Sequence, residues 1–93
     1  MSFKVVVSPR ADRDVDRLED WLADKNPAAA AKIWPAMKAA FLSLADMPHR
    51  TRGLGEDTRE LLVNFGRYGY VIRYQVTGQS VVVTRVFHGL EMR

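Results

Sequence analysis

Residues 60–88 read ELLVNFGRYGYVIRYQVTGQSVVVTRVFH, with three apolar and β-branched runs separated by short groups of glycine and polar residues. Runs of this kind bounded by turn residues are typical of β-strands. We therefore expect three strands, over residues 60–65, 68–76 and 80–87. Because the connections between them are short, the three strands are predicted to form an antiparallel meander.

Two helical patterns precede the meander. Ser8-Pro9 and Asn26-Pro27 each place a helix-capping side chain before a proline, which costs no hydrogen bond at the first helical position. Apolar residues then recur at helical spacing, at positions 11, 15, 18 and 22 and at positions 30, 33, 37, 41 and 44. The first helix is predicted to end near Asp24 and the second before Pro48, and Pro35 is expected to break or kink the second helix.

A β-branched run at residues 3–7 predicts one further strand, which must join the edge or the middle of the same sheet to be stable. Residues 48–58 show no periodicity and are expected to form a loop. The resulting order is β-α-α-β-β-β. Helices grouped before a run of strands indicate an α+β fold, here a helical hairpin packed on one face of a mainly antiparallel four-stranded sheet, with residues 1–93 as a single domain.

The composition excludes several classes of site. The chain has 93 residues and no cysteine, which rules out a disulfide scaffold, a thiolate nucleophile and a zinc site built on sulfur. A chain this short has a small core, so we expect no large cofactor. The sequence contains no metal-binding pair, so no metal is expected either. No stretch approaches 18 apolar residues, and the run before Ser8 is too short for a signal-peptide core. A cytoplasmic protein without membrane contact is therefore expected.

The net charge is +3, and the whole surplus lies in the second half of the chain. Residues 1–48 carry seven basic and seven acidic side chains, whereas residues 49–93 carry seven basic and four acidic ones. All seven later cations are arginines, whose planar guanidinium group suits two-pronged contacts with phosphate or carboxylate. An acidic or phosphate-rich partner is one interpretation, and an ordinary solvated surface is the other.

Two features of the helices are candidate partner contacts. Asp16 and Asp20 belong to a line of aspartates at i, i+4 spacing, which is either a solvated face or a docking surface for a basic segment. Trp21 and Trp34 flank the buried stripes, and each either closes the edge of the core or anchors a protein interface. The sequence pattern leaves both alternatives open.

The last strand carries a candidate catalytic group. Strict alternation predicts that Val81, Val83, Arg85 and Phe87 share one face, and that Val82, Thr84, Val86 and His88 share the other. Which face meets the helices is left open. His88 is a candidate general acid or base, because the unperturbed pKa of histidine side chains lies near neutrality, although a lone histidine at a strand end more often has a structural role. The pattern places no carboxylate or second histidine beside it.

Six short motifs follow one another along nearly the whole chain. They are VVVSPRA at residues 5–11 with Asp14, Pro27 with Ala30, Leu44 followed by Pro48, Arg59-Glu60-Leu61, YVIRY at residues 70–74 and RVFHG at residues 85–89. Together they resemble the RelE/ParE toxin superfamily. The resemblance implies the α+β fold expected above, and a bacterial toxin that a cognate antitoxin from the same operon neutralises.

Two branches of that superfamily differ in their target. RelE-like members cleave messenger RNA on the ribosome, whereas ParE-like members block DNA gyrase. The nuclease branch typically has Tyr-Arg in this second meander strand, but here Val71 follows Tyr70. The RVFHG ending is similar to ParE-like toxins, although the basic-basic-acidic sequence that commonly follows it is absent. The ParE-like branch is therefore the leading interpretation, and catalytic activity is not expected.

The ParE-like resemblance implies a gyrase inhibitor that acts by protein contact and forms a hetero-oligomer with a ParD-like antitoxin. The expected target-binding residues are Arg59, Arg73, Arg85, His88 and Arg93, and the expected antitoxin-binding residues are Trp21, Trp34, Asp16 and Asp20. One alternative is a ribosome-dependent mRNA endonuclease, with His88 as general acid or base and Arg73 and Arg85 stabilising phosphate charge. The other is a degenerate toxin that only binds its antitoxin.

Overall fold

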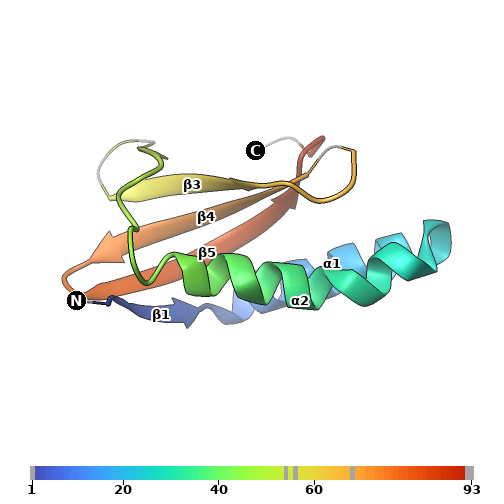
Figure 1. The fold of residues 1–93 in the computed structure, drawn as a ribbon, viewed down its shortest axis with the longest axis horizontal. Coiled ribbons are helices and arrows are strands. Elements are labelled where there is room, and N and C mark those ends of the chain that lie inside the picture. The colour runs from blue at the N-terminus through green and yellow to red at the C-terminus, as the bar shows by residue number, and fades with distance from the viewer. Residues whose placement is uncertain (1, 54, 56, 68, 92–93) are drawn as a thin grey trace.

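The structure is a computed structural model and describes residues 2–53, 55, 57–67 and 69–91. Figure 1 shows two helices lying along one side of a sheet. The elements, in chain order, are β1 (Lys4–Val7), α1 (Pro9–Lys25), α2 (Pro27–Ser43), β2 (Arg52–Gly53), β3 (Thr58–Val63), β4 (Tyr70–Thr77) and β5 (Ser80–His88). The predicted order β-α-α-β-β-β is confirmed, with the short β2 added in the segment predicted to be a loop.

The sheet has the strand order β1-β5-β4-β3-β2. β1 lies at one edge and runs parallel to β5, while the other neighbouring strands are antiparallel. At the opposite edge, β2 pairs with β3 through two residues. Two residues are too few to show the alternation that identifies a strand, so the sequence pattern could not predict β2. The predicted start of the second meander strand, Tyr68, lies outside the described residues.

Both helices begin where the capping signals predict. The Oγ atom of Ser8 accepts the N–H of Ala11 at 3.1 Å, and Oδ1 of Asn26 accepts the N–H of Ala29 at 3.1 Å. Each cap satisfies one of the backbone donors that a helix start leaves without a partner. The helix starts are thus determined by local chemistry, which is why the sequence predicts them.

Pro35 does not break the second helix as expected. α2 continues through the proline to Ser43. Ile33 and Met37 on either side of the proline are fully buried and hold this part of α2 on the core. Pro35 and Ala31 are exposed, so water can bind the Ala31 carbonyl that lacks its helical donor. Packing therefore outweighs the loss of one hydrogen bond.

The core fills the space between the helices and one face of the sheet. Its largest fully buried side chains include Tyr74, Leu18, Ile33, Met37, Leu44 and Ile72. The hydroxyl of Tyr74 donates a hydrogen bond to the carbonyl of Pro48 at 2.7 Å. That bond ties the segment after α2 to the middle of the sheet.

A β-bulge interrupts β5. The pairing shifts between Arg73 and Tyr74 of β4, which lie opposite Arg85 and Val83 of β5. Thr84 is therefore the extra residue of β5. An extra residue moves every later side chain of the strand to the other face.

The bulge overturns the predicted faces of β5. Val81 and Val83 before it and Val86 after it are all fully buried in the core, so all three point toward the helices. Arg85 and Phe87 point the opposite way, onto what we call the outer face of the sheet. The prediction that Val81, Val83, Arg85 and Phe87 share one face is wrong, because strict alternation has no place for an extra residue.

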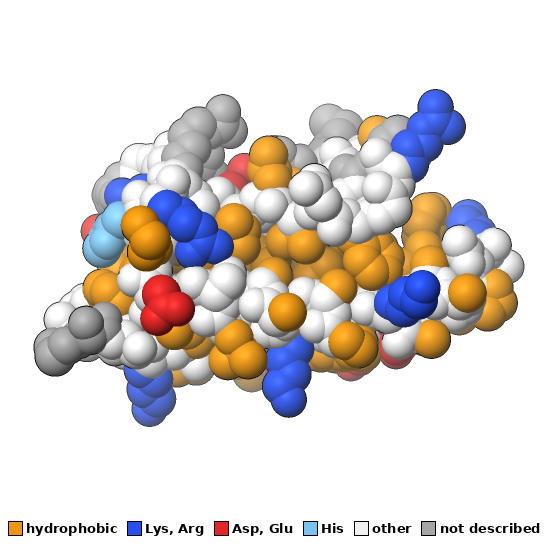
Figure 2. Space-filling view, in the orientation of Figure 1, with side chains coloured by type: hydrophobic (Ala, Val, Ile, Leu, Met, Phe, Trp, Pro, Cys, Tyr) orange, Lys and Arg blue, Asp and Glu red, His pale blue; other side chains and the backbone are white. Residues whose placement is uncertain are grey.

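Figure 2 shows hydrophobic side chains gathered in a hollow between α2 and β3. α2 packs against α1 and β1. Side chains of α2 and of the β3 region that pack on the core while remaining partly exposed are Trp34, Ala40, Leu61, Val63 and Phe65. Apolar surface near β3 is thus left open. Neither α1 nor α2 is long and apolar enough to span a membrane.

Candidate functional site

α1 takes over the edge of β5 where β1 ends. β1 pairs with β5 as far as Val83, whose carbonyl accepts the N–H of Ser8 at 2.9 Å. The Ser8 hydroxyl donates to the carbonyl of Thr84 at 3.3 Å. Further along α1, Oδ2 of Asp14 accepts the N–H of Val86 at 2.9 Å. These bonds fix the first half of α1 beside β5.

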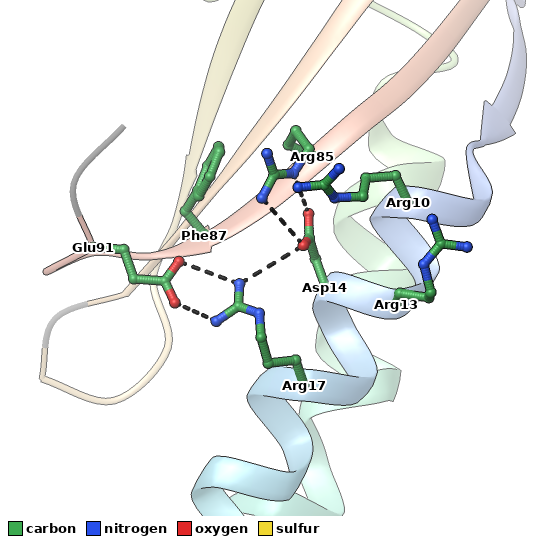
Figure 3. Close-up of a pocket in the computed structure, with 7 residues that line it drawn as sticks. All are labelled: Arg10, Arg13, Asp14, Arg17, Arg85, Phe87 and Glu91. Carbon is green, nitrogen blue, oxygen red and sulfur yellow. Dashed lines mark hydrogen bonds and ion pairs between the residues drawn. The ribbon is translucent and has the colours of Figure 1, made fainter.

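The space between α1, β5 and residues 89–91, which we call the C-terminal segment, is a pocket of about 560 Å³, shown in Figure 3. It is lined by Arg10, Arg13, Asp14, Arg17, Arg85, Phe87 and Glu91, and we call it the arginine pocket. The three arginines of α1 come together because spacings of three and four residues lie on one side of a helix. Four guanidinium groups and two carboxylates give the lining a formal charge of +2.

Two of the four arginines are held by carboxylates. The buried Asp14 binds Nε of Arg85 at 2.8 Å and lies 3.7 Å from Arg17. Arg17 also forms a bidentate pair with Glu91, as Figure 3 shows. The hydrogen bond to Glu91 raises the pKa of the Arg17 guanidinium above its ordinary value. Arg17 therefore stays charged at every physiological pH.

Arg10 and Arg13 differ from the other two arginines. Both are exposed, and neither forms a hydrogen bond or ion pair with any residue that the structure describes. Both lie in the first two turns of α1, where the helix dipole adds partial positive charge. This part of the arginine pocket is suited to an anionic group from another molecule.

Phe87 connects the arginine pocket to the outer face of the sheet. Its ring centroid lies 4.6 Å from the guanidinium carbon of Arg85 and 5.2 Å from that of Arg73. Arg73 is itself paired with the buried Glu60 at 2.9 Å. Cation–π contact and ion pairing therefore hold both outer-face arginines in place.

A second pocket, of about 470 Å³, adjoins the arginine pocket and shares Arg17 and Glu91 with it. Its other lining residues are Leu18, Trp21, His88 and Leu90, and we call it the apolar pocket. Trp21 is 46% exposed and Leu90 is 65% exposed. A sizeable apolar surface thus lies open directly beside the arginine pocket.

His88 is packed between aromatic rings at the apolar pocket. Its ring centroid lies 5.3 Å from that of Trp21 and 5.6 Å from that of Tyr70. Its Nδ1 accepts the backbone N–H of Leu90 at 3.2 Å. Burial raises the pKa of the neighbouring Tyr70 hydroxyl, and the charge of Glu91 raises it further.

The three groups of the endonuclease alternative lie on different sides of the sheet. His88 lies opposite Tyr70 and packs against α1, on the helix side. Arg73 and Arg85 flank Phe87 on the outer face. Each of these arginines is bound to a carboxylate. The three groups therefore do not converge on one common space.

Two other predicted target contacts lie elsewhere. Arg59 donates hydrogen bonds to the carbonyls of His49 and Thr51, at 3.1 and 2.6 Å, and so holds the segment before β3. Arg93 lies outside the described residues. Among the residues that the structure does describe, no group of three or more Asp, Glu or His side chains could hold a metal ion.

The predicted antitoxin contacts lie on different sides of the helices. Asp16 and Asp20 are exposed, while Trp21 turns toward the apolar pocket. Successive residues of a helix point about 100° apart, which separates Trp21 from Asp20. Trp34 of α2 packs against the core. Asp16 and Asp20 thus lie apart from Trp21, whereas Trp21 also lines a smaller pocket with Phe65, which packs on the core as Trp34 does.

Sequence analysis missed most of the arginine pocket. The surplus of positive charge lies in the second half of the chain, so the charge distribution does not point to Arg10, Arg13 and Arg17. The signal was their spacing of three and four residues, which places them on one side of α1. Glu91 gave no signal, because no local pattern indicates that the C-terminal segment folds back onto α1.

Comparison with known proteins relates the whole chain to bacterial toxins. A family model described as the ParE toxin of the type II toxin-antitoxin system parDE matches residues 5–93. The chain is 50% identical to Toxin RelE1 of Caulobacter vibrioides, over 100% of both chains. It is 37% identical to Toxin RelE3 of the same bacterium, over 96% of this chain and 97% of that one.

Two solved structures have a similar fold. One is a chromosomal ParDE TA system from P. aeruginosa, with a TM-score of 0.75 and 15% identity over 94% of this chain and 96% of that one. The other is the toxin-antitoxin complex RelBE2 from Mycobacterium tuberculosis, with a TM-score of 0.62 and 23% identity over 95% of this chain and 99% of that one.

Proposed function

The chain belongs to the ParE toxin family of type II toxin-antitoxin systems, within the RelE/ParE superfamily, and we propose that it inhibits DNA gyrase by protein–protein contact. Its proposed target-binding residues include Arg85 and His88, which line the two adjoining pockets. We further propose that a cognate, ParD-like antitoxin neutralises it. We therefore also propose that the toxin acts in the cytoplasm.

The observation that carries this proposal is the separation of the candidate catalytic groups. A general acid or base must lie within hydrogen-bonding reach of the reacting atom, and cations must face the charge that develops there. His88 lies on the helix side, while Arg73 and Arg85 lie on the outer face. This arrangement favours a contact surface over an assembled nuclease site.

The hollow between α2 and β3 is the proposed binding site of the antitoxin. Hydrophobic side chains line it in Figure 2, and an amphipathic helix buries its apolar face in a groove of this kind. Trp34 is the largest partly exposed side chain that α2 packs on the core. Asp16 and Asp20 on α1 would then contact basic residues of a longer antitoxin segment that wraps around the helices. Structural neighbours that are themselves toxin-antitoxin complexes support this part of the proposal.

A second candidate function is ribosome-dependent cleavage of messenger RNA. It is favoured by the names of the curated relatives, Toxin RelE1 and Toxin RelE3. In this alternative His88 acts as general acid or base, and Arg73 and Arg85 bind phosphate. Both arginines would first have to leave Glu60 and Asp14, which bind them in this structure.

The deciding experiment measures both activities on one preparation. Purified toxin is added to a DNA supercoiling assay with gyrase, and separately to ribosomes translating a defined messenger. We expect supercoiling to be inhibited and the messenger to remain intact. Messenger cut at defined codons, and no longer cut by the His88→Gln variant, would replace the gyrase proposal with the endonuclease. Antitoxin binding without either activity would identify a degenerate toxin.

A further inference from the structure

We propose that the arginine pocket and the apolar pocket form one docking surface for an acidic segment of the toxin's protein target. The proposal rests on the proposed function only in taking that target to be a protein. It adds three residues of α1, Arg10, Arg13 and Arg17, to the target-binding surface. It also assigns Glu91 the role of an internal occupant, which a carboxylate of the target replaces.

Charge complementarity identifies the first half of the ligand. Arg10 and Arg13 are exposed and have no hydrogen-bonding or ion-pair partner among the described residues. Arg17 lies on the same side of α1 and already holds a carboxylate, that of Glu91. Arginine binds carboxylates in this bidentate geometry whether they come from its own chain or from another. The arginine pocket therefore suits a segment with two or more acidic side chains.

The apolar pocket identifies the second half. It shares Arg17 and Glu91 with the arginine pocket, so a segment bound in one passes directly into the other. Trp21 and Leu90 are largely exposed there. An apolar side chain a few residues from the acidic ones would cover them. Exposed aromatic side chains beside charged groups are frequent anchors of protein interfaces.

The same apolar pocket argues against a nucleic-acid ligand. A nucleic-acid backbone repeats its charge at every nucleotide and is bound by a continuous row of cations. Here the cations of the arginine pocket are followed by Leu18, Trp21 and Leu90. Phosphates in that position would be placed over apolar side chains. An acidic and hydrophobic protein segment matches both pockets.

Glu91 binds Arg17 at the position that a carboxylate of the target would occupy. Its side chain is 30% exposed, so an incoming carboxylate can reach Arg17 without opening the core. The exchange replaces one charged hydrogen-bonded pair with another, which keeps Arg17 paired throughout. When Glu91 leaves Arg17, its carboxylate also releases the backbone N–H of His88, from which it accepts a hydrogen bond at 3.3 Å in this structure.

The test compares two matched double variants. Arg10→Gln/Arg13→Gln removes two exposed charges from the arginine pocket, and Lys32→Gln/Lys38→Gln removes two exposed charges from α2. Potency is measured as inhibition of purified gyrase and as growth arrest without antitoxin. We expect the arginine variant to lose at least about 10-fold in potency, the equivalent of one charged contact. The lysine variant should keep its potency, and both should still bind antitoxin.

Glu91→Gln should change the potency in the opposite direction. It removes the internal competitor while keeping the shape of the side chain, so potency should rise several-fold. Leu90→Asp places a charge in the apolar pocket and should lower potency, whereas Leu42→Asp, at an exposed position of α2, should not. Unchanged potency of Arg10→Gln/Arg13→Gln, or reduced potency of Glu91→Gln, would overturn the proposal.

A photoreactive residue at position 13 separates this inference from the choice of target. Cross-linking to an acidic segment of gyrase supports both proposals. Cross-linking to an acidic segment of another protein, with purified gyrase unaffected, keeps the docking surface and rejects gyrase. Cross-linking to RNA rejects the docking of a protein segment.

Discussion

The carboxylate of Asp14 on α1 accepts the backbone N–H of Val86 on β5 at 2.9 Å, although the two residues lie 72 positions apart. β1 has ended at this point, so a side chain of α1 replaces the backbone acceptor that a neighbouring strand would supply. The same carboxylate binds Arg85 at 2.8 Å. Asp14 thus joins the edge of the sheet, α1 and the arginine pocket.

Asp14→Ala should lower the free energy of unfolding by about 2 to 4 kcal/mol, because it leaves a buried N–H and an arginine without their acceptor. Asp14→Asn should cost less, since its amide oxygen can still accept from Val86. Chemical denaturation of the purified toxin measures both. Asp16→Ala, at an exposed position of the same helix, is the control and should change stability by less than about 0.5 kcal/mol. Equal losses in Asp14→Ala and Asp16→Ala would contradict this role.

Pro35→Ala should stabilise the toxin by about 1 to 2 kcal/mol. The alanine restores an N–H to the interior of α2, and the exposed proline ring makes no core contact that would be lost. Thermal unfolding of the variant measures the gain. Pro27→Ala, at the start of the same helix, should bring no gain, because that N–H has no helical acceptor. A lower melting temperature for Pro35→Ala would show that the proline has a packing role.

The parts of the fold that the sequence predicted are those set by local chemistry. Ser8-Pro9 and Asn26-Pro27 mark the helix starts without reference to the rest of the chain. The β-bulge at Thr84 depends instead on how β5 pairs with β4. Pro35 is tolerated because Ile33 and Met37 are buried by tertiary packing. Pairing and packing between distant segments leave little trace in a local pattern.

The residues of the candidate site also fall into two groups, those that the sequence predicted and those that only the structure revealed. Arg85 and His88 were predicted to bind the target because they belong to a recognisable motif near the chain end. Arg17 of α1 and Glu91, which line the same pockets, are paired with each other across 74 positions. No periodicity links residues that far apart. The arginine pocket therefore required the structure.

Tyr70 should make the toxin less stable in alkali. Burial, with the charge of Glu91, raises the pKa of its hydroxyl in the folded state above the ordinary value near 10. The unfolded chain then loses the proton first as the pH rises. The contribution of the protonated Tyr70 hydroxyl to the free energy of unfolding is fully present below about pH 10. It is lost as the pH rises from there through the folded-state pKa.

Denaturation of the unmodified toxin and of Tyr70→Phe between about pH 8 and pH 11.5 isolates this contribution. The difference in free energy of unfolding between the two proteins should stay constant up to about pH 9.5 and then shift in favour of the phenylalanine variant. A difference that stays constant over the whole range would show that Tyr70 has no raised pKa.

Trp34→Ala should weaken antitoxin binding by roughly 30-fold or more, the effect of removing an aromatic anchor from an interface. The reason is the hollow between α2 and β3, where apolar side chains remain partly exposed. Leu42→Ala is the matched control, because Leu42 is also on α2 and is 60% exposed without belonging to the core. Titration calorimetry with the purified antitoxin measures both affinities, and circular dichroism verifies that the variants are folded. If Trp34→Ala binds as tightly as Leu42→Ala while Trp21→Ala does not, the antitoxin helix lies over the apolar pocket instead. In that case the antitoxin and the target compete for one surface, and neutralisation is direct occlusion of the toxin's docking site.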